Sequence, residues 1–252
     1  MKNVLWVCTV FLTLNFCDEP PKKNEKKMKE TSTKMQSDWE VLFDGSSTDQ
    51  WHTYNGEGMS ENWHIEDDAL VFRPQKGKPK QNIVTNKEYT NFELSLEWRI
   101  SEVGNSGIFY GVVESENYFE PYLTGPEIQV LDNERHPDAK IKPNYHQAGA
   151  LYDMVQPSTD VCKPAGEWNH ILLTVDHKNN KASVVLNGTE IVSYEPNGAN
   201  WDALVTTSKF GNKKAPDYIE APDFGKFQTG KIGLQDHDDV VSYRNIKIRE
   251  IQ

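Results

Sequence analysis

One short segment of the chain gathers polar side chains that could act on a ligand. In EIQVL, polar and apolar residues alternate as in a strand that buries one face, so Glu127 and Gln129 point to the same side. A polar loop containing His146 follows, and a second strand is predicted at 148–152. Carboxylate, amide and imidazole groups can transfer protons and bind hydroxyl groups. We therefore predict a carbohydrate site with these two strands as its floor and wall.

A second pair of polar residues stands near the end of the chain. Gln235 and His237 are two residues apart in a predicted strand, so they also share one face. Solvent exposure alone does not require a polar pair on each of two strands. We predict that the two pairs meet in a single site.

The rest of the chain predicts mainly strands. The clearest is 91–100, where apolar and polar residues alternate as in an antiparallel sheet with one wet face. Hairpins are indicated at 62–72, which turns at its Asp-Asp pair, and around the Asn-Gly pair at 187–188. A single helix is predicted over 200–210, with Asn200 as its N-cap. Roughly a dozen strands, one helix and no internal repeat predict an all-β fold, a two-sheet antiparallel sandwich.

The composition excludes several classes of partner. The 252 residues carry a net charge of −11, and no dense Lys/Arg cluster occurs outside the N-terminal tail, so the chain is not expected to bind nucleic acid. Three cysteines are too few and too scattered for a disulfide framework or a zinc site. The seven Trp and ten Tyr suit a sandwich core or platforms that stack on sugars.

The N-terminus predicts export. Residues 1–17 contain an apolar run shorter than the ~20 residues of a membrane span, as in a secretory signal peptide. The segment ends in LNFC, which resembles a relaxed lipoprotein box with Cys17 as the lipidated residue. The polar residues 18–38 are expected to form a solvated tether, and 39–252 the folded domain. We expect a lipid-anchored protein of the periplasm or outer-membrane surface; an ordinary cleaved signal is the alternative.

Several ordered motifs resemble one bacterial family. Over residues 38–252 the chain is similar to the 3-keto-disaccharide hydrolase domain, common in lipoproteins of Bacteroidetes, in the order and spacing of LFDG, GNSGIFY, GPEIQVLDN, AGALYDM, GEWN, LNG, GLQDH and YRNIKIRE. The resemblance implies a concanavalin A-like jelly-roll sandwich and a glycan-degrading activity, with a carbohydrate as the partner. Two positions depart from the family pattern: Gly111 stands in place of a larger polar residue, and Asp238 in place of glycine.

The acid content of the first strand limits the chemistry. Many jelly-roll glycanases present a Glu-x-Asp-x-Glu pattern on one strand, and retaining hydrolysis needs two carboxylates about 5 Å apart. The corresponding residues here are Glu127, Gln129 and Leu131, so the second acid is an amide and the third is apolar. Conventional double-displacement hydrolysis is therefore not expected from this strand.

A sugar already oxidised at C3, which the resemblance implies, has other requirements. The ketone acidifies the C2 proton, so a base can remove it; the enediolate then expels the C1 substituent, and water adds back. The sequence offers Glu127 or His237 as the base. Candidates for the remaining roles are Gln129 and Gln235 as hydrogen-bond partners of the ketone or hydroxyls, and Tyr152 or His146 as proton donor to the leaving group.

Three further residues are candidates for substrate binding: Tyr110, Asp132 and Arg244. Asp132 could instead cap the turn that follows it, and Arg244 could pair with a carboxylate at the edge of the core. His136 is expected at the surface, and Asn105 in a backbone turn.

Two alternatives stay open. A divalent metal could stabilise the enediolate as a Lewis acid, with ligands drawn from Glu127, Asp132, His146 and His237. The chain could also be a non-catalytic carbohydrate-binding module, because the expected fold suits both roles and Gly111 departs from the family pattern.

Overall fold

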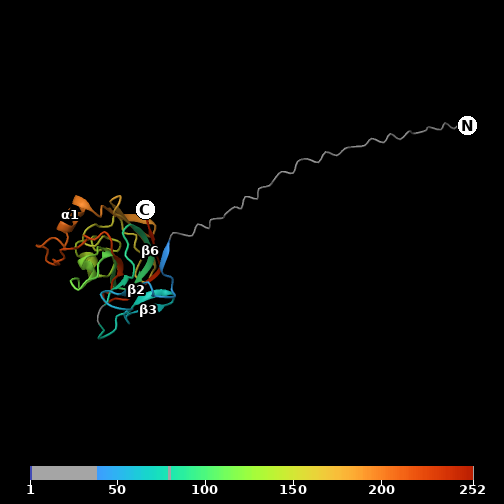
Figure 1. Cartoon of the computed structure of the whole chain (residues 1–252), viewed down its shortest axis with the longest axis horizontal. Coiled ribbons are helices and arrows are strands. Elements are labelled where there is room, and N and C mark those ends of the chain that lie inside the picture. The colour runs from blue at the N-terminus through green and yellow to red at the C-terminus, as the bar shows by residue number, and fades with distance from the viewer. Residues whose placement is uncertain (2–38, 79–80, 252) are drawn as a thin grey trace. The chain divides into compact units, whose positions relative to one another are not determined.

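The computed structural model of the chain describes residue 1 and residues 39–78 and 81–251 (Figure 1). The predicted signal segment, the tether and Cys17 lie outside the described residues. Within the described part of the chain, no helix is long and apolar enough to cross a membrane. The folded unit that carries the site is formed by the described residues from Trp39 onward.

The described residues form thirteen strands in two antiparallel sheets, which confirms the predicted all-β, two-sheet jelly-roll sandwich. The larger sheet contains β1 (Glu40–Phe43), β3 (Trp63–Glu66), β4 (Ala69–Phe72), β6 (Phe92–Ile100), β9 (Asn169–Asp176), β10 (Lys181–Leu186), β11 (Thr189–Tyr194) and β13 (Val241–Glu250). Its order is β11-β10-β9-β6-β13-β4-β3, with β1 also paired to β13.

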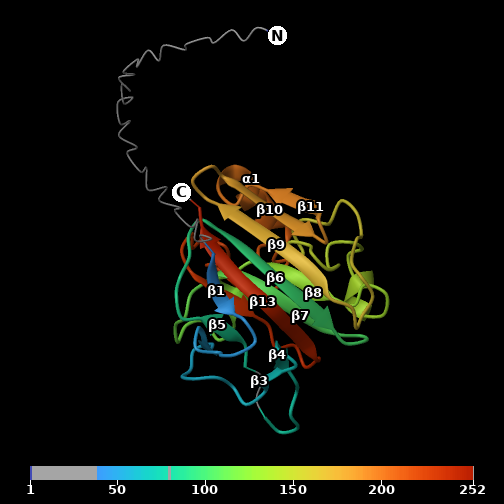
Figure 2. The same ribbon diagram turned by 90° about the vertical axis from the view of Figure 1, so that its right-hand side faces the viewer.

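The smaller sheet contains β2 (Trp51–Thr53), β5 (Ile83–Thr85), β7 (Asn105–Val112), β8 (Glu127–Leu131) and β12 (Lys231–Leu234), in the order β2-β5-β12-β7-β8. Figure 2 shows β9, β6 and β13 of the larger sheet lying across β7 and β8. The main core fills the space between the sheets, where the alternating apolar residues of β6 are at most 2% exposed. Loops cover the outer face of the smaller sheet, so β7 and β8 are buried along their whole length.

Both predicted hairpins are present. β3 and β4 are joined at Asp67 and Asp68, which have φ of 48° and 59°. β10 and β11 are joined at Asn187 and Gly188, with φ of 49° and 85°. Two consecutive residues with positive φ match the twist of antiparallel strands, which is why Asn, Asp and Gly occupy these turns.

The helix is displaced from its predicted bounds. α1 covers Gly198–Thr207, and its N-cap is Asn197, whereas the prediction was 200–210 with Asn200 as the cap. Asn200 instead lies inside the first turn, where its side chain donates to Glu195 at 2.9 Å. The helix ends because Ser208 takes an extended conformation, with φ of −82° and ψ of 169°. The residues after Ser208 are therefore free to turn toward the smaller sheet.

The segment 148–152 does not form the predicted strand, but it lies beside β8. This segment forms only isolated bridges, from Leu151 to Ile128 and from Leu151 to Val155. It nevertheless follows the open edge of β8, since Gln129 N donates to the Ala150 carbonyl at 3.0 Å and Tyr152 N to the Glu127 carbonyl at 2.9 Å. A regular ladder does not develop, because the backbone turns through positive φ at both ends of the segment.

Candidate active site

A pocket of about 410 Å³ lies on the outer face of the smaller sheet. Five residues predicted from the sequence line it together: Glu127, Gln129, Tyr152, Gln235 and His237. The remaining lining residues come from β7, from the loops around η1 (Pro121–Leu123) and η2 (Pro137–Lys140), and from the segment after α1; they are Asn105, Tyr122, His136, Pro137, Asp138, Ile141, Lys209, Phe210 and Ile219. The structure thus brings the first and last polar pairs into one cavity.

Three neighbouring strands position the floor of the pocket. β7 lies between β8 and β12, and Gly107 of β7 pairs with Gln129 of β8. On its other side, Gly107 accepts a hydrogen bond from Gln235 N at 2.9 Å. β12 ends at Leu234, before Gln235 and His237, which the sequence placed inside this strand, but this bond extends the pairing far enough to aim Gln235 at the pocket.

Gly107 makes room for the carboxyl group of Glu127. A Cβ atom built on Gly107 would lie 2.0 Å from Glu127 Oε1, well inside van der Waals contact. The Glu127 side chain therefore lies directly over the Gly107 backbone. A residue with any side chain at 107 would displace the carboxyl group, so the glycine is a requirement of the site.

Glu127 is a buried acid whose pKa lies near neutral pH. It is 8% exposed, and none of the described residues donates a hydrogen bond to its carboxyl group. Burial raises its pKa to about 8; the nearby charges of Lys209 and His146 act to lower it, and that of Asp138 to raise it. A carboxyl group in this state can take up or release a proton near neutral pH.

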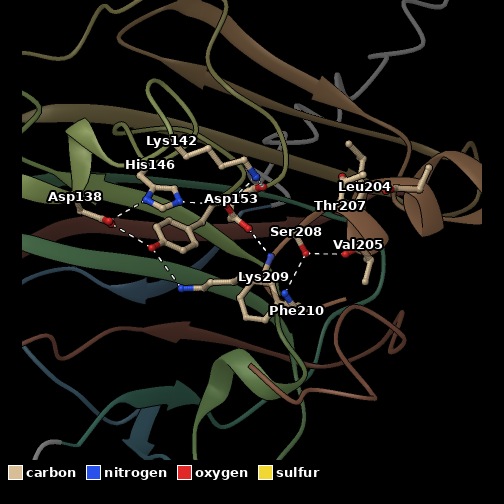
Figure 3. A network of polar contacts seen from close by, with 12 residues as sticks. Asp138, Lys142, His146, Asp153, Leu204, Val205, Thr207, Ser208, Lys209 and Phe210 are labelled. Carbon is tan, nitrogen blue, oxygen red and sulfur yellow. Dashed lines mark hydrogen bonds and ion pairs between the residues drawn. The ribbon is translucent and has the colours of Figure 1, made fainter. Parts of the chain in front are cut away.

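Lys209, Tyr152 and Asp138 line one side of the pocket. Figure 3 shows Asp138 and Lys209 within the network of polar contacts on this side. The Lys209 ammonium lies 4.4 Å from the centre of the Tyr152 ring and donates to the Tyr152 hydroxyl oxygen at 3.4 Å. The Tyr152 hydroxyl in turn donates to Asp138 Oδ2 at 3.2 Å. Burial acts to raise the Asp138 pKa, but hydrogen bonds from His146 and Tyr152 lower it overall, so Asp138 is ionised.

His146 lies behind this wall and does not line the pocket. It is 2% exposed, its Nδ1 is 2.8 Å from Asp138 Oδ1, and its Nε2 is 3.2 Å from Asp153 Oδ1. Burial acts to lower its pKa, but the two carboxylates outweigh burial and raise the pKa to about 9. Its ring stacks on that of Tyr152 with centres 4.3 Å apart. His146 is therefore a buried imidazolium that supports the wall from behind.

Three amide side chains complete the floor. Gln129 Oε1 accepts from the backbone N–H of Val130 at 3.1 Å, which leaves its NH₂ group as the donor. Asn105 Oδ1 and Gln235 Oε1 are buried, and neither has a hydrogen-bond partner among the described residues. Buried polar atoms without partners are uncommon in folded proteins, so these amides point to a polar ligand. His237 is exposed and stands at the mouth of the pocket.

Residues 38–249 match the model of the 3-keto-alpha-glucoside-1,2-lyase-like domain. The chain belongs to this family. A 3-keto-disaccharide hydrolase of Bacteroides thetaiotaomicron is 36% identical over 227 residues, which cover 83% of this chain and 77% of that protein.

Two solved structures from Parabacteroides distasonis ATCC 8503, both provisionally described as glycosyl hydrolases, are similar to this lyase-like domain. One has a TM-score of 0.74 and 29% identity, over 85% of this chain and 94% of its own. The other has a TM-score of 0.62 and 25% identity, over 84% of this chain and 99% of its own. The fold of the domain is thus shared with proteins of solved structure over most of its length.

Tyr110 and Arg244 were expected to bind substrate, but the lyase-like domain places both outside the pocket. Asn105, Gly107 and Phe109 face outward along β7, so Tyr110 faces the core, where its hydroxyl bonds to that of Tyr194 at 2.8 Å. Arg244 lies on the larger sheet, where it pairs with Glu97 at 2.5 Å. The structure thus favours the ion-pair alternative for Arg244.

Asp132 also lies outside the pocket, at the end of β8. It accepts hydrogen bonds from the backbone N–H of Val103 at 2.9 Å and from Arg135 at 3.3 Å. It also accepts from the backbone N–H of Glu134, at 3.2 Å. These contacts match the alternative in which Asp132 caps the turn rather than binding substrate.

The proposed metal ligands do not converge in the lyase-like domain. Glu127 and His237 line the pocket, but Asp132 and His146 are engaged by other residues outside it. Within the described ranges, no group of three or more His, Cys, Asp or Glu side chains could hold a metal ion. The described residues therefore do not fit the metal site considered from the sequence.

Four polar residues of the pocket were not predicted: Asn105, His136, Asp138 and Lys209. Lys209 was placed inside the helix, and His136 at the surface. Asn105 was expected to bond backbone, but its side-chain oxygen has no hydrogen-bond partner among the residues that the structure describes. The only sequence signal for Asp138 is that an acid follows the His-Pro pair. In the structure its backbone N–H donates to His136 Nδ1 at 3.1 Å.

The departure at Gly111 has a backbone explanation. Its φ is 65°, and a Cβ atom built there would lie 3.0 Å from the Phe227 carbonyl oxygen. A positive φ favours glycine over any larger residue. Gly111 does not line the pocket, so the departure leaves the candidate site intact.

Proposed function

We propose that this chain cleaves 3-keto-glycosides by removing the C2 proton, eliminating the C1 substituent and adding water. The observation that carries the proposal is Glu127, a buried floor carboxyl group whose pKa is raised to about 8. A base removes a carbon-bound proton best when its pKa lies near the working pH. The likeness to a 3-keto-disaccharide hydrolase supports a 3-keto sugar as the substrate.

A conventional pair of catalytic carboxylates is not favoured. Asp138 is the second acid of the pocket, but His146 donates to its Oδ1 and Tyr152 to its Oδ2. A carboxylate whose two oxygens are both engaged is a poor nucleophile toward a sugar carbon. Chemistry that needs one free base fits this pocket better than chemistry that needs two free acids.

The proposed reaction runs in two halves. Glu127 takes the C2 proton, and the electron pair of the broken C–H bond gives an enediolate with its negative charge on O3. The C3 carbonyl then re-forms as a C1–C2 double bond forms and the C1–O bond breaks, and the leaving oxygen takes a proton from an acid. In the second half, the oxygen of water bonds to C1, one proton of that water returns to the acid that protonated the leaving group, and C2 regains a proton from Glu127. The products are a 3-keto sugar and the free aglycone.

Lys209 and Gln129 are suited to stabilise the enediolate. The Lys209 ammonium is close enough to Glu127 to lower the pKa of its carboxyl group, so a sugar bound over Glu127 also lies near this cation. The Gln129 NH₂ group is the free end of its amide and can donate to the ketone oxygen. Donors fixed before the reaction stabilise charge as it develops, without reorganisation.

His237 is suited to protonate the leaving group. It stands exposed at the mouth of the pocket, where an aglycone would extend into solvent. The sequence indicated Tyr152 or His146 for this role, but Tyr152 already donates its hydroxyl proton to Asp138, and His146 does not line the pocket. We therefore assign the leaving-group proton to His237, and a structural role in the wall to Tyr152.

The test compares an aryl 3-keto-glucoside with the same glucoside unoxidised at C3. Wild-type protein is expected to release the phenol from the first and not from the second. Glu127→Gln should reduce release by roughly 10³-fold, because general-base catalysis contributes 10²–10⁴-fold. The matched control is Glu167→Gln, since Glu167 is exposed and lies outside the pocket. Wild-type protein that binds the 3-keto-glucoside without turning it over would instead establish the binding-module alternative.

A further inference from the structure

A ring of polar contacts lies behind the pocket wall and joins three separate segments of the chain (Figure 3). Asp153 makes several of these contacts, and its Oδ2 accepts a hydrogen bond from the backbone N–H of Lys209 at 2.6 Å. Its Oδ1 is 3.2 Å from His146 Nε2 and 2.8 Å from Lys142 Nζ. The joined segments are the loop after β8, the turn that contains Asp153 and the residues after α1. One carboxylate therefore holds together the walls of the pocket.

His146 can satisfy this ring only when both of its nitrogens carry protons. Its two ring nitrogens face two carboxylates, Asp138 and Asp153, and a carboxylate can only accept. A neutral imidazole would turn a nitrogen lone pair toward one of them. With 2% of its surface exposed, His146 has little access to water that could replace the lost bond.

The bond from His146 sets the direction of the next two contacts. With Nδ1–H donated to Oδ1, Asp138 is an ionised acceptor and takes the Tyr152 hydroxyl proton on Oδ2. The Tyr152 oxygen then turns its lone pair to the Lys209 ammonium, which also lies over the ring. The His146 ring stacks on Tyr152 and limits its tilt. The chain of contacts thus runs from a buried imidazolium to the cation of the pocket.

We propose that His146 is a positioning residue, which acts through Asp138 and Tyr152 to hold the Lys209 ammonium where the enediolate forms. The role rests on the proposed function, because it concerns the cation that stabilises the intermediate. His146 does not line the pocket, and nothing in this role requires it to touch the substrate. It differs from the donor and metal-ligand roles that the sequence indicated for this histidine.

The first test is His146→Gln, which can no longer donate to two opposed carboxylates. We expect kcat for the 3-keto-glucoside to fall roughly 10–100-fold, as for partners that orient catalytic groups, while KM changes less than about threefold. The matched control is His177→Gln. His177 is partly buried and, like His146, hydrogen-bonded, in its case to Asn197 at 3.1 Å, but it lies away from the pocket, so its substitution should leave kcat unchanged.

A double-mutant cycle separates positioning from a general structural role. If His146 acts through Asp138, then Asp138→Asn should lower kcat by a similar factor, and adding His146→Gln to it should have little further effect. Independent, multiplying losses would overturn the proposal. So would His146→Gln protein that is folded by circular dichroism and has the wild-type kcat.

If His146→Gln does not fold, the cycle is carried out with Asp138→Asn and Tyr152→Phe. Tyr152→Phe keeps the stacked ring but removes the hydroxyl between Asp138 and Lys209. Losses that do not multiply support a single positioning chain, and losses that multiply contradict it. Failure of the proposed function gives a different result, because wild-type protein would then be inactive on every 3-keto-glycoside tested.

Discussion

Among single residues, Glu127 and its surroundings determine the chemistry proposed for the pocket. The alternation of its strand was enough to place Glu127 and Gln129 on one face, and the structure buries that face in the pocket. Alternation could not reveal the pKa, which depends on burial by distant loops and on the charge of Lys209. Lys209 itself was missed because the sequence contains no strong stop signal where α1 ends.

The raised pKa predicts the pH dependence of activity. Glu127 must be ionised to act as the base, and below its pKa of about 8 the ionised fraction falls tenfold per pH unit. We expect kcat/KM for a 3-keto-glucoside to rise with pH up to about 8 and then to level off. The measurement is a pH–rate profile corrected for spontaneous substrate decay. A profile already flat between pH 6 and 9 would contradict this assignment of the base.

The same shift predicts that the wild-type residue lowers stability at high pH. The folded-state pKa of Glu127, about 8, exceeds its ordinary value of 4.5, so its stabilising contribution is present below pH 4.5 and is lost as pH rises through 8. At pH 9, the free energy of unfolding of Glu127→Gln, measured by urea denaturation, should therefore exceed that of wild type by roughly 2–4 kcal/mol. At pH 5 the two proteins should differ little. If the free energies of unfolding of the variant and the wild type differed equally at both pH values, the raised pKa of the buried Glu127 carboxyl group would be ruled out.

At the scale of elements, three strands of the smaller sheet make the floor. The sequence predicted the strands, but not which face of β7 would be outward. The spacing of Asn105, Gly107 and Phe109 contains that information, and it would have moved Tyr110 into the core. Asp138 could not be placed in this way, because its loop takes its shape from contacts with His146 and Tyr152.

The contact between Gly107 and Glu127 is tested by Gly107→Ala. The added methyl group would lie 2.0 Å from Glu127 Oε1, so the carboxyl group must move. A displacement of about 1 Å at a catalytic group lowers activity by as much as 10²-fold, and we expect kcat/KM to fall by about that much. Gly233→Ala is the matched control, since its methyl group would meet the Phe109 side chain at 3.2 Å, which can yield. Unchanged activity in Gly107→Ala would contradict the described position of Glu127.

At the scale of the whole molecule, the sandwich brings together polar pairs that are about a hundred residues apart in the sequence. Alternating burial predicted the two sheets, because every strand of a sandwich must hide one face. The pairing of β12 with β7 was not predictable from local pattern, since strand order depends on contacts between distant segments. That pairing is what makes Gln235 and His237 neighbours of Glu127.

The N-terminal segment leads to a prediction about cellular location. We propose that the chain is exported and anchored to the cell envelope through a lipid on Cys17, as LNFC indicates. In a bacterial host, wild-type protein should incorporate labelled palmitate and sediment with membranes. Cys17→Ser should lose the label, and Cys162→Ser, the control, should keep it. Unlabelled wild-type protein would favour an ordinary cleaved signal.

In the proposed reaction, the C2 proton is removed before the glycosidic bond breaks. The most direct test of this order is the rate of phenol release from an aryl 3-keto-glucoside carrying deuterium at C2, in competition with the unlabelled substrate. We expect kcat/KM to be several-fold lower for the deuterated compound, and the product formed in D₂O from unlabelled substrate to acquire deuterium at C2 faster than the free 3-keto sugar exchanges. Equal rates for the two substrates, with the original C2 hydrogen retained in the product, would contradict this order.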